Sequence, residues 1–196
     1  ILNGIDTSKW NPEIDTLIPK NYSRENIFDK YYNKTELQKK FGLEVNPDIP
    51  VIGIVSRFVE QKGIIELFAI CADMKVQFVV MGSGEVWCEK EVKSLEEKIP
   101  NFKSFIGYDK ELDHLIVSGS DFMLMPSRYE PCGTIQMYCQ TYGTLPIARN
   151  TGGFSDTIEN YNEQTGAGTG FLFNDLTPQS VYDTVGWAVF AWYNKS

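Results

Sequence analysis

The side chains best suited to chemistry lie in segments that directly follow short apolar runs. Arg57 and Lys62 belong to one such segment, Ser56–Gly63, which comes after the apolar run Val51–Val55. Arginine presents a planar fork of donors and lysine a compact charge, and both bind phosphate oxygens well. We therefore predict that the two cations hold a diphosphate. The alternative is that both are solvated loop charges paired with Glu60.

A second segment, Pro126–Gly133, contains a carboxylate between two prolines, with a glycine close behind. It follows the apolar run Phe122–Met125 and leads into a predicted helix over Cys132–Tyr142. The unpaired N–H groups of a helix start can hold a phosphate. Glu130 can accept hydrogen bonds from sugar hydroxyls beside such an anion. The alternative role of Glu130 is to complement the helix dipole.

Three smaller features follow apolar runs in the same way. The Gly82-Ser83-Gly84 segment and the pair Gly152 and Gly153 let backbone approach a ligand or turn tightly, although neither forms the GxGxxG dinucleotide fingerprint. Tyr108 follows a predicted strand, where an aromatic ring can stack on a base. The alternatives are plain turns for the glycines and packing for the tyrosine.

These segments are positioned by strands and helices that alternate along the chain. Apolar runs of four to six residues indicate strands buried on both faces, and the alternation predicts an α/β fold: a doubly wound, mostly parallel, Rossmann-like sheet with helices on both faces. Ligands bind beyond the carboxyl ends of such strands. The predicted strands are Val51–Val55, Gln77–Met81, Lys103–Ile106, Phe122–Met125, Leu145–Ala148 and Gly170–Phe173. The predicted helices are Lys34–Phe41, Gly63–Cys71, Val86–Lys98, Lys110–Ser118, Cys132–Tyr142, Ser155–Tyr161 and Pro178–Tyr193, the last with Thr177 as its N-cap.

Length and composition exclude several classes of protein. A chain of 196 residues fits one domain, residues 1–196, and its net charge of -8 argues against nucleic-acid binding. No apolar run is long enough to span a bilayer, and the start lacks the pattern of a signal peptide. The four cysteines form no CxxC pair and there is a single histidine, so we expect free thiols and no zinc site.

Taken together, the motifs resemble those of bacterial glycogen synthases and plant starch synthases, in order and in spacing. The resemblance covers nearly the whole chain, and the Glu-Pro-Cys-Gly motif combined with Arg…Gln-Lys-Gly is specific. The matching segments are Leu2–Asp6, Trp10–Pro12, Val55–Arg57, Gln61–Gly63, Gly82–Gly84, Pro126–Gly133, Tyr142–Thr144, Thr151–Gly153 and Gly168–Phe171.

The resemblance implies the C-terminal, donor-binding domain of a two-domain glycosyltransferase of the GT-B type. Such an enzyme transfers glucose from ADP-glucose or UDP-glucose to the non-reducing end of an α-1,4-glucan, with retention at the anomeric carbon. The resemblance implies that Arg57 and Lys62 bind the diphosphate and stabilise the departing nucleotide, and that Glu130 contacts the glucose hydroxyls. No metal or other cofactor is expected, because the two cations take the metal's role. The substrate-binding residues implied are Tyr108, which would stack on the base, the helix start Cys132, Gly133, Thr134 and Ile135, and the glycines Gly152 and Gly153.

Two positions bear on how close the resemblance is. Ile135 stands where many family members carry a threonine that faces the phosphate. Tyr138 stands where many retaining relatives, such as sucrose-phosphate or trehalose-type enzymes, carry a second acid. Synthases lack that acid too, which favours the narrower assignment, with front-face attack by the acceptor's 4-hydroxyl and proton transfer to the leaving phosphate.

The resemblance also implies partners and a setting. We expect the protein's own N-terminal acceptor domain, which this chain lacks, to be a partner together with nucleotide-sugar and α-glucan. The chain alone is therefore expected to be inactive. The expected location is the bacterial cytoplasm or the plastid stroma. The alternative function is a non-catalytic nucleotide-sugar or glucan-binding module, although such a homologue would be expected to lose Arg57, Lys62 or Glu130, and all three are present.

Overall fold

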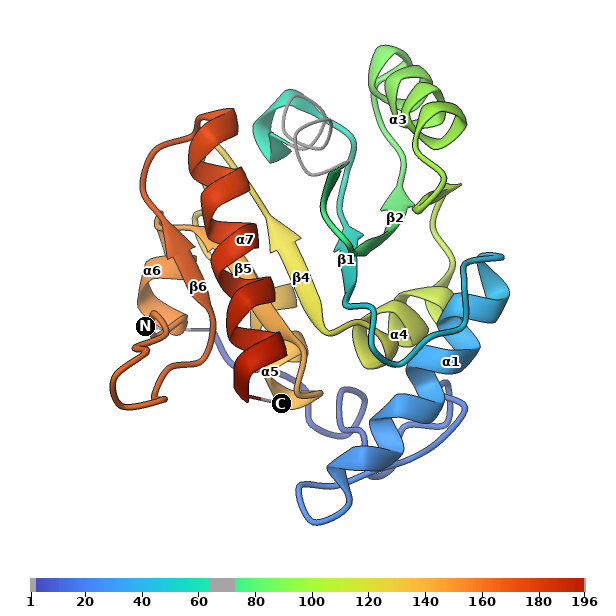
Figure 1. The fold of residues 1–196 in the computed structure, drawn as a ribbon, viewed down its shortest axis with the longest axis vertical. Helices are drawn as coiled ribbons and strands as arrows, with labels where there is room; N and C mark the ends of the chain where they lie inside the picture. The colour runs from blue at the N-terminus through green and yellow to red at the C-terminus, as the bar shows by residue number, and fades with distance from the viewer. Residues whose placement is uncertain (1–2, 64–72, 196) are drawn as a thin grey trace.

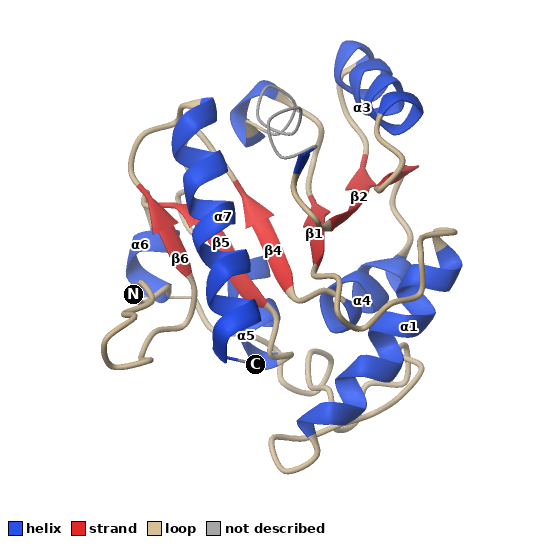
Figure 2. Cartoon of the chain, in the orientation of Figure 1, coloured by secondary structure: helices blue, strands red, loops and turns tan. Residues whose placement is uncertain are grey.

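The structure is a computed structural model that describes residues 3–63 and 73–195. The predicted helix Gly63–Cys71 lies outside these residues apart from Gly63. Within them, the strands form a single all-parallel sheet in the order β3-β2-β1-β4-β5-β6 (Figures 1 and 2). The strands are β1 (Val51–Val55), β2 (Gln77–Gly82), β3 (Phe102–Ile106), β4 (Phe122–Met125), β5 (Leu145–Arg149) and β6 (Phe171–Phe173).

Helices cover both faces of this sheet, as the buried strands require. Successive strand residues alternate between two cores: Phe78 and Val80 join the first, while Val79 and Met81 join the second. Helices α3 and α7 pack on the first core, and α1, α4, α5 and α6 contribute to the second. The helices are α1 (Lys30–Lys40), α3 (Val86–Lys98), α4 (Lys110–Gly119), α5 (Ile135–Thr141), α6 (Gly153–Thr157) and α7 (Pro178–Lys195), with short 3-10 turns η1 (Ile27–Asp29) and η2 (Glu60–Lys62). The predicted doubly wound fold is confirmed.

Most predicted elements are confirmed within one or two residues, and three boundaries are wrong. Helix α1 begins at Lys30 rather than at Lys34. The prediction missed its first turn because the buried residues Asn33 and Lys34 are polar, so this part of the helix lacks the apolar periodicity that marks a helix in the sequence. Helix α5 begins at Ile135 rather than at Cys132, because Gly133 has a left-handed φ of 66° that no α-helix contains.

Helix α6 occupies Gly153–Thr157 rather than Ser155–Tyr161. The chain becomes extended at Ile158, and Asn160 forms an isolated parallel bridge with Gly170. The amide of Tyr161 then donates to the carbonyl of Gly170 at 2.8 Å. Pairing with the segment before β6 therefore ends the helix early.

The N-cap of α7 is confirmed, since Thr177 Oγ1 accepts from the amide of Ser180 at 3.2 Å.

The irregular segment before η1 is fastened to the domain by buried aromatic and polar contacts. The ring of Trp10 stacks between His114 and Tyr138, with centroid distances of 3.9 and 4.2 Å. The buried Asp15 carboxylate contacts His114 Nδ1 at 2.7 Å and accepts from the hydroxyl of Tyr142 at 2.6 Å. Tyr138 is thus a packing partner of this segment.

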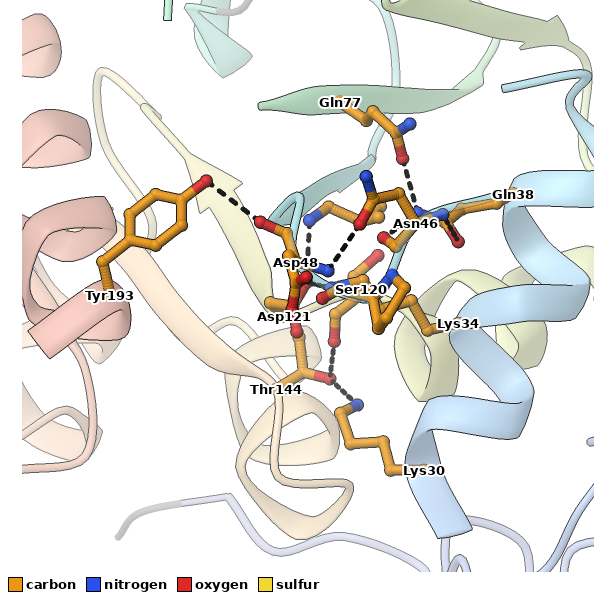
Figure 3. Close-up of polar contacts among 12 residues, drawn as sticks. Lys30, Lys34, Gln38, Asn46, Asp48, Gln77, Ser120, Asp121, Thr144 and Tyr193 are labelled. Atoms are coloured by element: carbon orange, nitrogen blue, oxygen red, sulfur yellow. Dashed lines mark hydrogen bonds and ion pairs between the residues drawn. The ribbon is translucent and has the colours of Figure 1, made fainter. Parts of the chain in front are cut away.

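Polar contacts at the amino ends of the strands join α1 to the sheet (Figure 3). Lys34 Nζ lies 2.8 Å from Asp121 Oδ2, the same oxygen that accepts the amide of Val51 at 2.7 Å. Lys30 Nζ donates to Thr144 Oγ1 and to the carbonyl of Ser118, both at 2.7 Å. Burial lowers the pKa of Lys30 to about 7. This network occupies the edge of the sheet opposite to the loops that follow β1 and β4.

Candidate functional site

The loops after β1 and β4 meet where the strand order reverses. From β1 the chain proceeds outward through β2 to β3, and from β4 it proceeds the other way through β5 to β6 (Figure 1). In a doubly wound sheet this switch point opens a crevice beyond the carboxyl ends of the two central strands. The loop 56–63 follows β1 and the loop 126–134 follows β4, so the structure brings the two main predicted segments together.

An ion pair joins these two loops. Lys62 Nζ lies 2.5 Å from Glu130 Oε2, and the two side chains are only 18% and 12% exposed. The buried hydroxyl of Ser127 donates to the same oxygen at 3.3 Å. Both contacts use Oε2, so Oε1 carries neither of them. The partner of Lys62 is therefore Glu130, and the alternative that paired it with Glu60 is wrong.

Arg57 is exposed at the end of β1. Phe58, its neighbour, is buried and extends the pairing with β2 through a bridge to Gly84. Within residues 3–63 and 73–195, the guanidinium of Arg57 makes no ion pair or hydrogen bond; Glu60 pairs instead with Arg128, whose Nη2 lies 3.5 Å from Glu60 Oε1. Arg57 can therefore reach toward a ligand at this edge without breaking a contact to the described residues.

The glycines after β5 pack against the backbone of the Glu130 segment. The amide of Gly153 donates to the carbonyl of Glu130 at 2.9 Å. A Cβ atom added to Gly152 would lie 2.1 Å from that carbonyl oxygen, and one added to Gly153 would lie 1.7 Å from the carbonyl oxygen of Cys132. These glycines permit a close approach of two loops, which is a structural reason for glycine at both positions.

The backbone before α5 keeps free donors beside Glu130. Within the part of the chain that the structure describes, no hydrogen bond uses the amides of Cys132, Gly133 or Thr134. Thr134 is the N-cap of α5, but its side chain makes no capping bond. The amides predicted to bind phosphate therefore lie in an irregular loop, and Ile135 begins the helix that follows it.

Tyr108 lies on the surface just beyond the end of β3. Its side chain is 70% exposed, so it is not a core residue and the packing alternative is wrong. Its hydroxyl donates to Asp113 Oδ2 at 3.5 Å, and burial raises the pKa of Asp113 to about 6. The ring lines a cavity of about 330 Å³ together with Trp10 and His114.

Sequence reasoning missed the residues that hold the two loops in place. Ser127 contacts Glu130, Arg128 contacts Glu60, and Arg149 at the end of β5 donates to the carbonyl of Arg128. The available signal was polar residues at the ends of buried strands, since parallel strands end at one edge of the sheet. Among the described residues, no three metal-ligating side chains cluster, and no helix is long and apolar enough to cross a membrane.

The fold and the switch-point loops define a Rossmann-like domain of the GT-B glycosyltransferase class. The family model described as glycosyl transferases group 1 matches residues 35–188, and the chain belongs to this family. Tyr108, Glu130 and Gly153 all lie within the matched span.

Several relatives cover this chain completely while being much longer. A protein named glycogen synthase from Treponema denticola is 59% identical, over 100% of this chain and 41% of its own length. Glycogen synthase 1 from Geobacter metallireducens is 45% identical, over 100% of this chain and 40% of its own length. The chain thus spans about two fifths of the length of the relatives that it matches.

Solved structures agree on the fold. The catalytic domain of starch synthase IV from Arabidopsis thaliana, bound to ADP and acarbose, superposes with a TM-score of 0.90 at 32% identity, covering 100% of this chain and 42% of that one. The C-terminal domain of a glycosyl transferase group 1 family protein from Francisella tularensis superposes at 0.64 with 18% identity, covering 95% of this chain and 88% of that one. The second likeness concerns the fold alone.

Proposed function

We propose that this chain is the donor-binding domain of a glycogen or starch synthase, which transfers glucose from ADP-glucose or UDP-glucose to the non-reducing end of an α-1,4-glucan with retention. The observation that carries the proposal is the contact between Lys62 and Glu130 across the switch point. A cation for the diphosphate and a carboxylate for the sugar lie side by side there. The names of the relatives and the starch synthase structure with ADP support the same reading.

The leaving diphosphate is stabilised by positive charge in this proposal. Arg57 supplies an exposed guanidinium, and Lys62 supplies an ammonium that the phosphate shares with Glu130. The amides of Cys132 and Gly133 add neutral donors. Groups that stabilise the charge developing in the transition state make the largest contribution to lowering the activation barrier. Removing one such donor raises the barrier by on the order of 3–4 kcal/mol.

Glu130 orients the sugar rather than attacking it. Its Oε2 is held by Lys62 and Ser127, so Oε1 is the oxygen that accepts from glucose hydroxyls. The acceptor's 4-hydroxyl attacks the anomeric carbon from the face that the diphosphate leaves. The bond to the acceptor oxygen forms as the bond to phosphate breaks, and a phosphate oxygen takes the hydroxyl proton.

Tyr108 is the stacking residue for the base in this proposal. Its exposed ring accepts either adenine or uracil, because stacking is tolerant of base identity. The two cations fill the role of a metal. Glucan and the enzyme's own N-terminal domain are the proposed partners, and the cytoplasm of a bacterium is the proposed location, since both named glycogen synthases are bacterial.

Calorimetric titration of the chain with ADP, and separately with UDP, tests the donor site. We expect Kd values between micromolar and millimolar, roughly 4–8 kcal/mol of binding free energy. Arg57→Ala should weaken ADP binding by about tenfold or more, because a charge-assisted contact to phosphate is lost. Arg24→Ala removes a cation from the segment before η1 and is the matched control. Equal affinity in wild type and Arg57→Ala would contradict the assignment of Arg57.

A further inference from the structure

Arg149 links the end of β5 to two loops at the carboxyl edge of the sheet. It is the last residue of β5, between β4 and β6 in the sheet (Figure 1). Its Nε donates to the carbonyl of Asn174, after β6, at 3.1 Å, and its Nη1 donates to the carbonyl of Arg128, after β4. One planar guanidinium therefore fixes the distance between these two backbone segments.

The other side of Arg128 is held by the loop after β1. Its amide donates to the carbonyl of Gln61 at 2.8 Å, and its Nε donates to the carbonyl of Glu60 at 3.3 Å. The side-chain amide of Gln61 donates in turn to the carbonyl of Tyr129 at 3.2 Å. Gln61 and Tyr129, joined in this way, are the immediate chain neighbours of Lys62 and of Glu130.

We propose that Arg149 is a positioning residue, which acts through the backbone of Arg128 to set the distance between Lys62 and Glu130. The proposal rests on the donor site described above. An orienting contact of this kind matters because a misplacement of about 1 Å in a binding or catalytic group costs up to roughly a hundredfold. The competing role for Arg149 is a third cation in direct contact with the diphosphate.

A double-mutant cycle with ADP separates the two roles. We expect Arg149→Met to weaken ADP binding about tenfold in the wild-type background and by less than about twofold in Lys62→Met, because a positioning residue acts through the group that it positions. Arg24→Met, which removes one cation elsewhere, should change the affinity by less than about twofold. Full additivity of the Arg149 and Lys62 losses would overturn the proposal in favour of direct contact.

Amide hydrogen exchange tests the same proposal without ligand. Arg149→Met should speed exchange at the amides of Arg128 and Gly153, which donate to Gln61 and Glu130, by about tenfold. The amide of Gln77, which donates to Pro50 at the opposite edge, should exchange unchanged and so exclude global destabilisation. Unchanged exchange at Arg128 and Gly153 would overturn the proposal. Absence of ADP binding in the wild-type chain would count against the donor site instead, and the exchange result would still decide the role of Arg149.

Discussion

Glu130 has two oxygens with different surroundings, and this asymmetry organises the site at the scale of single residues. Oε2 faces Lys62 and Ser127, and both side chains of the ion pair are mostly buried. Removing one member of a buried pair leaves the other charge uncompensated, so the effect depends on what replaces the lost partner. For Lys62 the proposed replacement is the phosphate of a nucleotide.

Glu130→Gln should therefore bind ADP more tightly than the wild type, by about three- to tenfold. The substitution keeps the shape of the side chain and removes the charge that competes with phosphate for Lys62. Transfer activity of the full-length enzyme should fall by about a hundredfold or more, because the carboxylate proposed to orient the sugar is lost. Calorimetry and a glucan-elongation assay measure the two effects.

Glu60→Gln provides the control for loss of one negative charge in the same region. Glu60 is 70% exposed and pairs with Arg128 rather than with Lys62, so its ADP affinity should stay within about twofold of the wild type. Weaker ADP binding in Glu130→Gln would show that the carboxylate supports the diphosphate site instead of competing for its lysine.

At the scale of elements, the site depends on loops packed backbone to backbone. The turn between β5 and α6 touches the Glu130 segment through Gly152 and Gly153, with no room for a side chain. Helix α5 begins only after Gly133, so the amides before it remain available to a ligand. Small residues thus decide how closely three strand ends can converge.

Gly153→Ala should destabilise the fold by more than about 2 kcal/mol and abolish ADP binding. Its Cβ would lie 1.7 Å from the carbonyl oxygen of Cys132, so the loop must move away from Glu130. Chemical denaturation and calorimetry measure the two effects.

A glycine that lacks such a neighbour should respond in the opposite direction. Gly186 lies within α7, and its nearest neighbour to an added Cβ is the end of Met74 at 3.6 Å. Gly186→Ala should stabilise the chain by about 0.5–1 kcal/mol, because alanine is the better helix former. If both variants lost stability equally, steric exclusion at Gly153 would not be the cause.

At the scale of the whole molecule, the carboxyl and amino ends of the strands differ in the polar groups that they carry. The carboxyl edge carries the ion pair between the loops after β1 and β4, while the amino edge carries a polar network around Lys30, Lys34 and Asp121 (Figure 3). Lys34 has a carboxylate partner in Asp121, whereas Lys30 donates to neutral oxygens. Burial of the Lys30 ammonium therefore lowers the free energy of unfolding of the whole domain.

Lys30→Met should stabilise the chain by about 1–2 kcal/mol at pH 6, and this difference should fall and change sign as the pH rises toward 10. Burial lowers the pKa of Lys30 from the ordinary value of 10.5 to about 7, so between these values the unfolded chain binds the extra proton. The wild type therefore regains stability from this group as the pH rises through that window. Denaturation of both proteins from pH 6 to 10 measures the difference, and a pH-independent difference would contradict the lowered pKa.

Much of the architecture could be predicted from the sequence by itself. The apolar runs located β1 and β4 to the residue, and the periodicity and end signals located α3 and the N-cap of α7. These features depend on local patterns, namely which residues are buried on both faces and which cap a helix. The same patterns placed Arg57, Lys62 and Glu130 after strands, and therefore at one edge of the sheet.

The partners of those residues were decided only by the tertiary structure. Lys62 pairs with a carboxylate 68 positions away rather than with Glu60 two positions away, because strand order places β1 beside β4. Arg149 and Ser127 contribute through backbone and carboxylate contacts that no periodicity encodes. A local pattern records burial along the chain, whereas the order of strands depends on how all the helices pack on both faces at once.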